Sequence, residues 1–506
     1  MSQSKTINQL MQESQVSFGT SGARGLVSKM TDQICYSYTH GFIQFLKQNQ
    51  QLGEIESIAI AGDLRPSTAE IMNACAKAIE DFGIKVINCG YIASPAIALY
   101  GIENKLPTIM VTGSHIPDDR NGIKFNTPQG EILKTDEQQI REQEISITAD
   151  LFDRHGMFTS FENYLPLFSN KAQQLYIQRF IDFFPANTLT GKKLGIYQHS
   201  GVARDDITHI LKALGANVTV LNRSDVFIPV DTEAVRDEDH KLAKQWQQQY
   251  QFDAILSTDG DADRPLICDE NGRWLRGDII GILCAQYLGI KHLVTPISSN
   301  TAVEKSLLFN SVTRSKIGSP YVIAEMDKLL NSGNTNIAGY EANGGFLTAD
   351  DIELNGKVLK KLPTRDALIV MLALLHLSKM KQLPLSLLAQ SLPQRFTYSD
   401  RLKAIDSQIS QKIIHVYLDK TNGKEKIEAD FGRAFGQSNS DRSKLSSLDT
   451  TDGLRLTFTN NNIIHFRPSG NAPEFRCYTE SNSMQLAQQI NAYCLEKIRE
   501  IAQSYK

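Results

Sequence analysis

The chain has 506 residues, too many for one hydrophobic core, so we expect three or four domains of ordinary size. Its 41% hydrophobic and 22% charged residues are typical of a soluble globular protein. The formal net charge of −3 excludes an overall field that would gather nucleic acid or an anionic membrane. We therefore expect neither as a partner, and any site for an anion must be local.

The polar N-terminal residues 1–15 lack the apolar stretch of a secretory signal, and the chain has no run of about 18 apolar residues. We therefore expect a cytoplasmic protein. The seven cysteines lie in apolar segments without CxxC spacing, which indicates buried free thiols rather than disulfides or a zinc site.

From about residue 57 the sequence alternates between strand-like and helix-like segments, and this order occurs three times. The predicted strands are 57–62, 84–90, 107–113, 193–200, 215–221, 252–258, 292–298 and 336–341. The predicted helices are 67–83, 205–215, 240–251, 277–289 and 321–333. Alternation of this kind predicts mostly parallel sheets covered by helices.

The C-terminal segment has a different pattern. Residues 453–470 are typical of a hairpin, 474–481 of a third strand, and 483–503 of a closing amphipathic helix. The sequence therefore predicts an α/β protein: three similar α/β domains with mixed, mostly parallel sheets, and a C-terminal α+β domain, around a central cleft. The expected domains are 1–169, 170–273, 274–388 and 389–506.

Three aspartates, Asp259, Asp261 and Asp263, alternate with small residues directly after the strand predicted at 252–258. Carboxylate oxygens in this arrangement suit Mg²⁺ or Ca²⁺. An EF-hand calcium loop begins with the same spacing, but it needs glycine where this chain has Arg264, and a helix where the pattern predicts a strand. A solvated acidic turn is disfavoured, because three crowded carboxylates repel one another without a cation.

Three other loops carry polar groups suited to phosphates and sugars. Ser114 follows a glycine and precedes His115, in a loop that we expect to run over residues 112–124. Taken alone, such a serine is more often a helix cap. Residues 467–476 combine arginines, a serine, a glycine and an asparagine in a turn between two strands, which favours a phosphate monoester. The loop at 18–25 places Arg24 between glycines, where an anion site and a flexible turn both stay open.

Together these loops resemble those of the α-D-phosphohexomutase superfamily, most closely bacterial phosphomannomutase/phosphoglucomutase. The family's serine loop, T-x-S-H-x-P, matches residues 112–117, and its metal loop, D-G-D-x-D-R, matches 259–264. Its sugar loop matches 341–345, and its phosphate loop, R-x-S-G-T-x-P, matches 467–473. The four motifs occur in the family's order, and the resemblance covers essentially the whole chain.

The resemblance implies roles for each loop and its domain. Domain 1–169 would carry the phosphorylated serine, Ser114, whose phosphate completes a Mg²⁺ site. The resemblance implies metal ligands Asp259, Asp261 and Asp263, and catalytic residues Arg24, His115, Lys124 and Arg264, with Lys124 or His115 as the acid/base. It implies substrate contacts from Glu341 and Asn343 to the sugar, and from Arg467, Ser469, Gly470, Asn471 and Arg476 to the phosphate that is not reacting.

The implied enzyme is an intramolecular phosphotransferase that interconverts hexose 6-phosphate and hexose 1-phosphate through a phosphoserine and a hexose 1,6-bisphosphate. Mannose is the expected sugar, for nucleotide-sugar and polysaccharide synthesis. Asn343 and Gly345 stand where many bacterial members have serine and histidine, and Asn471 stands where threonine is common. The E-A-N-G form of the sugar loop is also similar to that of phosphoacetylglucosamine mutases.

Several alternatives stay open. Phosphoglucomutase and phosphoglucosamine or phosphoacetylglucosamine mutase are the nearest ones. A phosphoserine hydrolase is disfavoured, because a separate phosphate clamp would be superfluous. The alternative outside enzymes is a Ca²⁺-binding protein. The expected cofactors are Mg²⁺ and a hexose 1,6-bisphosphate as intermediate or activator, and the expected assembly is a monomer or homodimer.

Overall fold

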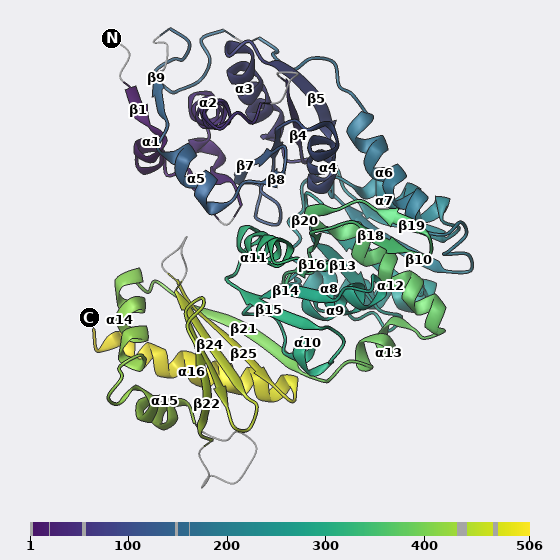
Figure 1. Ribbon diagram of the computed structural model, residues 1–506, viewed down its shortest axis with the longest axis vertical. Helices are drawn as coiled ribbons and strands as arrows, with labels where there is room; N and C mark the ends of the chain where they lie inside the picture. Colours follow the sequence, from purple (N-terminus) through teal and green to yellow (C-terminus); the bar gives the residue numbers. More distant parts are fainter. Residues whose placement is uncertain are drawn as a thin grey trace. The chain divides into compact units, whose positions relative to one another are not determined.

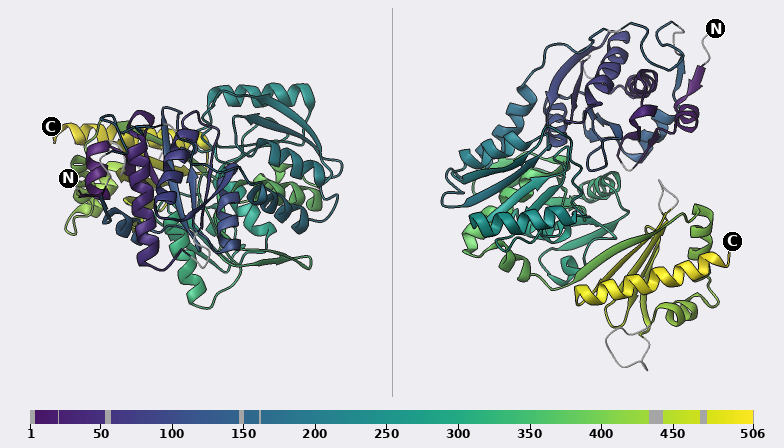
Figure 2. Two further views of the ribbon diagram at one scale, coloured as in Figure 1. Left: turned by 90° about the horizontal axis from the view of Figure 1, so that it is seen from above. Right: turned by 180° about the vertical axis from the view of Figure 1, so that it is seen from behind.

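The computed structural model describes residues 4–19, 21–52, 57–146, 150–160, 162–432, 443–468 and 474–505 (Figures 1 and 2). The chain divides into two compact units. Unit 1 comprises residues 1–294, 309–313 and 318–391, and unit 2 comprises residues 295–308, 314–317 and 392–506. No helix in the described ranges is long and apolar enough to cross a membrane.

The first sheet of unit 1 has the order β2-β3-β7-β6-β4-β5, with β8 paired to β7. Its strands are β2 (Ser17–Phe18), β3 (Ala23–Leu26), β4 (Ser57–Gly62), β5 (Lys85–Tyr91), β6 (Thr108–Val111), β7 (Arg120–Thr127) and β8 (Gly130–Glu131). Its main helices are α2 (Asp32–Gln48), α3 (Thr68–Asp81) and α4 (Ser94–Asn104). Strand β4 is parallel to β5 and β6, and it is buried along its whole length because α3 and α4 both pack against it.

The second sheet has the order β11-β10-β12-β13. Its strands are β10 (Lys193–His199), β11 (Asn217–Arg223), β12 (Ala254–Thr258) and β13 (Pro265–Cys268), and its helices are α6 (Lys171–Phe183), α7 (Arg204–Ala213) and α8 (Asp237–Tyr250). Strands β10, β11 and β12 are parallel, whereas β13 turns back antiparallel to β12. The three aspartates lie in the loop that joins β12 to β13.

The third sheet has the order β15-β14-β16-β17-β20. Its strands are β14 (His292–Pro296), β15 (Ser311–Ser315), β16 (Ile337–Tyr340), β17 (Phe346–Thr348) and β20 (Leu362–Asp366), and its helices include α9 (Gly277–Tyr287), α11 (Ser319–Asn331) and α12 (Ala367–Lys381). Strands β14 and β16 are parallel, and β17 and β20 add antiparallel strands at one edge.

Unit 2 contains an antiparallel sheet with the order β21-β25-β24-β23-β22. Its strands are β21 (Phe396–Lys403), β22 (Leu445–Asp449), β23 (Leu454–Phe458), β24 (Ile463–Pro468) and β25 (Glu474–Ser481). Helix α16 (Met484–Gln503) packs against β21 and β25 and lies across the sheet in Figure 2. Apolar side chains of the strands and of α16, among them Phe466, Phe475 and Ile498, form a core of their own.

The predicted α/β class and the predicted strands and helices between residues 57 and 341 are confirmed, as are the C-terminal hairpin, third strand and closing helix. All seven cysteines are buried and free, as expected. Each main sheet lies within one of the four predicted domains, but compactness divides the chain in two, so the four boundaries stay a prediction.

Two expectations about local structure were wrong. Arg24, expected in a loop or turn, lies on strand β3, which pairs with β2 and β7. The loop expected over residues 112–124 ends early, because β7 begins at Arg120 and pairs with both β6 and β3. The charged residues Arg120 and Lys124 interrupt the apolar pattern by which a buried strand is predicted from sequence. The structure accommodates Lys124 because its ammonium group has acidic partners in the interior.

Candidate active site

Ser114 lies in the short loop between β6 and β7 with its backbone in the left-handed region, at φ 56°. The side chain is buried, and its Oγ donates a 2.6 Å hydrogen bond to Asp259 Oδ2. The Nδ1 of His115 lies 3.3 Å from the same Oγ. The loop between the first sheet's strands therefore brings the predicted serine against the predicted metal loop, 145 residues further along the chain.

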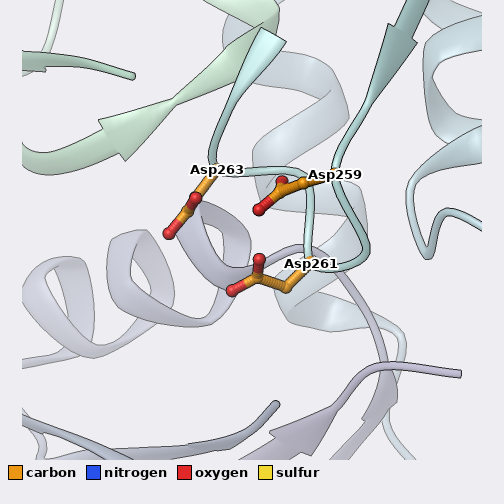
Figure 3. Close-up of side chains that lie close together, drawn as sticks. All are labelled: Asp259, Asp261 and Asp263. Carbon is orange, nitrogen blue, oxygen red and sulfur yellow. The ribbon is translucent and has the colours of Figure 1, made fainter. Parts of the chain in front are cut away.

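Asp259, Asp261 and Asp263 are all buried, and one carboxylate oxygen of each lies within 4.8 Å of the others (Figure 3). The tight turn is possible because Ala262 adopts a left-handed φ of 59°. Among the described residues, the buried Oδ1 atoms of Asp261 and Asp263 have no hydrogen-bond partner. Unpartnered carboxylate oxygens that converge in the interior fit a hard divalent cation such as Mg²⁺.

The electrostatics of this triad also favour a cation. Burial and the charges of Asp261 and Asp263 raise the pKa of Asp259 well above its usual range. Burial acts on Asp261 in the same direction, but Lys124 and Ser94 outweigh it and hold the pKa of Asp261 below its usual range. This geometry excludes two alternatives for the aspartate loop. It is not an EF-hand, because strand β12 precedes it where an EF-hand has a helix, and it is not a solvated acidic turn, because the three aspartates are buried.

Cationic side chains surround the triad and Ser114. Lys124 Nζ lies 2.6 Å from Asp261 Oδ2 and 2.9 Å from Asp263 Oδ2. Arg264 Nε lies 3.8 Å from Asp259 and 3.6 Å from Asp263. The buried Nε atoms of Arg24 and Arg264 have no hydrogen-bond partner within the described part of the chain, which fits an anion beside Ser114.

The same charges set the protonation of nearby groups. Burial, followed by the charges of Arg264 and Arg24, lowers the pKa of His115, so its imidazole is neutral at pH 7. Burial and Arg264 lower the pKa of Arg24 to about 10. Burial alone would lower the pKa of Lys124, but the carboxylates of Asp261 and Asp263 raise it, so the side chain is protonated.

The predicted sugar loop follows β16 and lies within the same unit. Its Glu341 and Asn343 are buried, and Asn343 Oδ1 accepts a 2.9 Å hydrogen bond from Gly345 N. Thr232 Oγ1 donates a 2.8 Å hydrogen bond to Asn343 O and fixes the loop from the second sheet's domain. Gly277, at the start of α9, is required here, because a Cβ would lie 2.3 Å from Ala342 O.

Sequence reasoning missed two residues that connect these loops. Arg365, on β20, forms an ion pair with Asp263 Oδ2 at 2.8 Å and donates to Glu341 Oε2 at 3.0 Å, so it joins the metal loop to the sugar loop. Ser94, at the start of α4, donates a 2.6 Å hydrogen bond to Asp261 Oδ2. Strand β20, with the sequence LPTRD, has no apolar pattern that could have marked Arg365. Nothing in the sequence distinguishes Ser94 from an ordinary helix-initiating serine.

The predicted phosphate clamp lies in unit 2. Arg467 on β24 and Arg476 on β25 occupy directly paired positions, and Arg467 Nε contacts Asp452 Oδ2 at 2.9 Å. Paired positions on adjacent strands point to the same face of a sheet, so the two arginines share one face. Ser469, Gly470 and Asn471 lie outside the described residues.

Comparison with known proteins gives consistent results. Family models described as phosphoglucomutase/phosphomannomutase, alpha/beta/alpha domain I and domain III, match residues 15–149 and 276–396. The chain is 45% identical over 491 residues to a phosphomannomutase of Salmonella muenchen, covering 97% of each chain. It is 38% identical over 475 residues to one of Sinorhizobium fredii, covering 94% of this chain and 97% of that one.

The fold is also similar to a solved structure. A phosphoglucomutase/phosphomannomutase family protein of Burkholderia thailandensis superposes with a TM-score of 0.68 at 18% identity, covering 95% of this chain and 97% of that one. At this identity the likeness concerns the fold, and it extends over nearly the whole of both chains.

Proposed function

The chain belongs to the phosphoglucomutase/phosphomannomutase family, and from this premise we propose that it interconverts mannose 6-phosphate and mannose 1-phosphate. The identity of 45% to a phosphomannomutase supports the choice of sugar. The observation that carries the chemistry is the 2.6 Å contact of Ser114 Oγ with a buried aspartate triad in which, among the described residues, the Oδ1 atoms of Asp261 and Asp263 have no hydrogen-bond partner.

The triad residues Asp259, Asp261 and Asp263 would hold Mg²⁺, together with the phosphate on Ser114. The cation would supply positive charge that offsets the charge of the phosphoryl group during transfer. Arg24 and Arg264 would hold the oxygens of that group, because the buried Nε donor of each has no hydrogen-bond partner among the described residues. Fixed cations in a buried site need no reorganisation during the reaction.

In the proposed reaction the phosphoryl group leaves Ser114 Oγ, and a new O–P bond forms to the free hydroxyl of the hexose monophosphate. The neutral imidazole of His115 would take the hydroxyl proton, and protonated Lys124 would give a proton to Ser114 Oγ as it departs, so these two residues are the acid/base candidates. The product is a hexose 1,6-bisphosphate. After this intermediate turns over, its other phosphate returns to Ser114 Oγ, whose proton passes back to Lys124, while His115 gives its proton to the departing sugar oxygen.

Substrate binding divides between two loops in this proposal. Glu341 and Asn343 would bind sugar hydroxyls. Because Asn343 Oδ1 already accepts from Gly345 N, its amide N–H₂ is the group left for a ligand, so it would act as a donor. Arg467 and Arg476, with the loop between them, would hold the phosphate that is not reacting. Mannose 1-phosphate is a form of the sugar from which nucleotide sugars are made. A cytoplasmic location and a monomeric or dimeric state stay predictions.

The test of the proposed function is phosphate on Ser114 together with mutase activity. Intact-mass analysis of the purified protein should show a fraction carrying one phosphate, mapped to Ser114. Ser114→Ala should lose nearly all activity while still folding. Ser257→Ala is a matched control, because Ser257 is also buried and donates one hydrogen bond, to Tyr197 O at 2.8 Å, outside the site.

Coupled assays with mannose, glucose, glucosamine and N-acetylglucosamine phosphates, each with Mg²⁺ and a trace of 1,6-bisphosphate, identify the sugar. Mannose phosphate should give the highest kcat/KM. Substantial turnover by Ser114→Ala would contradict the phosphoserine route, and release of inorganic phosphate in place of the isomer would identify a hydrolase.

A further inference from the structure

Arg65 lies under the serine loop, and its guanidinium group is completely buried. Nε donates to Asp63 Oδ2 at 3.1 Å. Nη1 donates to the carbonyl oxygens of Pro117 at 2.8 Å and Arg120 at 3.0 Å. Nη2 donates to the carbonyl oxygens of Ser114 at 2.9 Å and of Ile116 at 2.6 Å. A guanidinium has five N–H donors, so every donor of Arg65 is used.

The carboxylate of Asp63 connects this arginine to the backbone of Ser114 by a second route. Thr112 Oγ1 donates to Asp63 Oδ2 at 2.7 Å and accepts from Ser114 N at 2.7 Å. Asp63 Oδ1 accepts from Arg65 N at 3.1 Å and from Thr68 Oγ1 at 2.9 Å. Both the N–H and the C=O of Ser114 are therefore held by one buried network.

Close packing holds the guanidinium in place. A Cβ at Gly113 would lie 2.6 Å from Arg65 Cζ, so only glycine lets the loop approach the arginine this closely. Arg65 Cζ also lies 4.1 Å from the ring centroid of Phe227. The aromatic face adds a favourable cation–π contact and shields the hydrogen bonds from water.

We propose that Arg65 is the positioning residue of the reactive serine: it draws four loop carbonyls around one cation and so fixes Ser114 in its left-handed conformation, with Oγ toward the aspartate triad. This inference rests on the proposed phosphoserine function. With all five donors used, Arg65 has none left for a sugar phosphate. It acts on the reaction through the loop backbone and not through the substrate.

The test measures phosphoryl uptake by Ser114 directly. Dephosphorylated enzyme is mixed with excess glucose 1,6-bisphosphate and Mg²⁺, and the gain of one phosphate is followed by intact mass over time. In Arg65→Lys, one ammonium group cannot replace five planar donors. Because a displacement of about 1 Å costs about 100-fold in rate, we expect uptake to slow by about that factor. In steady-state assays, kcat should fall while KM for the hexose phosphate is unchanged.

Two further variants separate positioning from folding. Arg65→Ala leaves space for free guanidinium, so millimolar guanidinium chloride should restore part of the uptake rate, whereas equal sodium chloride should not. Thr112→Val removes the hydroxyl that holds Ser114 N and should also slow uptake, whereas Thr112→Ser should retain it. Arg395→Lys is the matched control: Arg395 is also buried and contacts Glu480 at 2.6 Å, so this variant should lose stability but take up phosphate normally.

The outcomes distinguish the two proposals. If the wild-type enzyme takes up no phosphate, the proposed function fails and this inference with it. If the wild-type enzyme is phosphorylated and folded Arg65→Lys and Thr112→Val match its rate, the function stands and the positioning role is overturned. A rise in KM without a fall in the uptake rate would also overturn it, because it would place Arg65 on the substrate.

Discussion

The ammonium group of Lys124 contacts the carboxylate of Asp261 at 2.6 Å, and both groups are buried. The lysine comes from the antiparallel strand β7 of the first sheet, and the aspartate from the metal loop of the second. Their contact joins the two halves of the proposed site through opposite charges. It also places a protonated candidate for the general acid beside the residues that would hold the metal.

Lys124→Met should therefore affect metal binding and catalysis in opposite directions. Removing the ammonium takes the lysine partner from Asp261 and leaves Asp263 with its arginine partners alone, so Mg²⁺ should bind more tightly in a calorimetric titration. Loss of a general acid/base typically costs 10²- to 10⁴-fold in rate, so kcat should fall by about that factor. Weaker Mg²⁺ binding by the folded variant would show that Lys124 does not compete with the metal.

Asp261→Asn should weaken Mg²⁺ binding and catalysis together. The amide keeps the size of the side chain but removes one of the charges that a divalent cation requires. We expect a weaker Mg²⁺ affinity in calorimetry and a higher Mg²⁺ concentration for half-maximal activity. Asp253→Asn, a change of an acid that pairs with Lys192 outside the site, should leave both values unchanged. Full wild-type activity after exhaustive chelation would contradict a metal role for the triad.

The sequence was sufficient to predict many of the elements between residues 57 and 341 and those after residue 453, because the periodicity of these segments and the glycines that end them are local features, but it did not predict helices α4, α6 and α12. It also placed the serine and metal loops, since both follow apolar strands. It did not reveal Arg65, whose role depends on four carbonyls that fold around it and on Gly113 above it. Such a network is formed by tertiary structure and has no spacing that a sequence pattern can show.

The contact of Arg365 with both the metal loop and the sugar loop could not be predicted from the sequence, for a related reason. Its two partners, Asp263 and Glu341, lie 102 and 24 residues earlier in the chain, and they meet only after two sheets have packed together. Strand β7 was missed in part because the charges of Arg120 and Lys124 interrupt its apolar pattern. Buried charges contradict hydrophobic patterning, and they occur where function outweighs the cost of burial.

Arg467→Ala should lower kcat/KM by about 10- to 100-fold, because a charge-assisted contact to phosphate contributes about 1.5–3 kcal/mol. Part of that energy should align the sugar hydroxyl, so kcat should fall as well as KM rise. The phosphate on Ser114 should remain. Asp452→Asn is the matched variant, since it retains Arg467 but removes its charged 2.9 Å partner, and its loss of activity should be smaller. Unchanged kinetics in Arg467→Ala would remove this arginine from the site.

His465 gives unit 2 a predictable response to acid. The imidazole on β24 is buried and stacked on Tyr478, and its Nε2–H donates to Asp452 O at 2.6 Å. Its other ring nitrogen, Nδ1, has no hydrogen-bond partner among the described residues. Burial lowers the pKa of His465 to about 4, whereas an unfolded histidine titrates near 6.5.

Between these two pKa values the unfolded chain binds a proton that the native protein does not. The contribution of His465 to stability is therefore complete above pH 6.5 and is lost as the pH falls through 6.5 toward 4, by about 2.5 kcal/mol between pH 7.5 and 4.5. Hydrogen exchange of peptides covering β24 and β25, corrected for intrinsic rates, measures this loss. His465→Gln keeps a donor for Asp452 O but does not titrate. Between pH 7.5 and 4.5, the free energy of unfolding of this variant should therefore fall by about 2.5 kcal/mol less than that of the wild-type protein. Equal losses in the two proteins would mean that carboxylates alone cause the acid response, and that the buried imidazole does not control it.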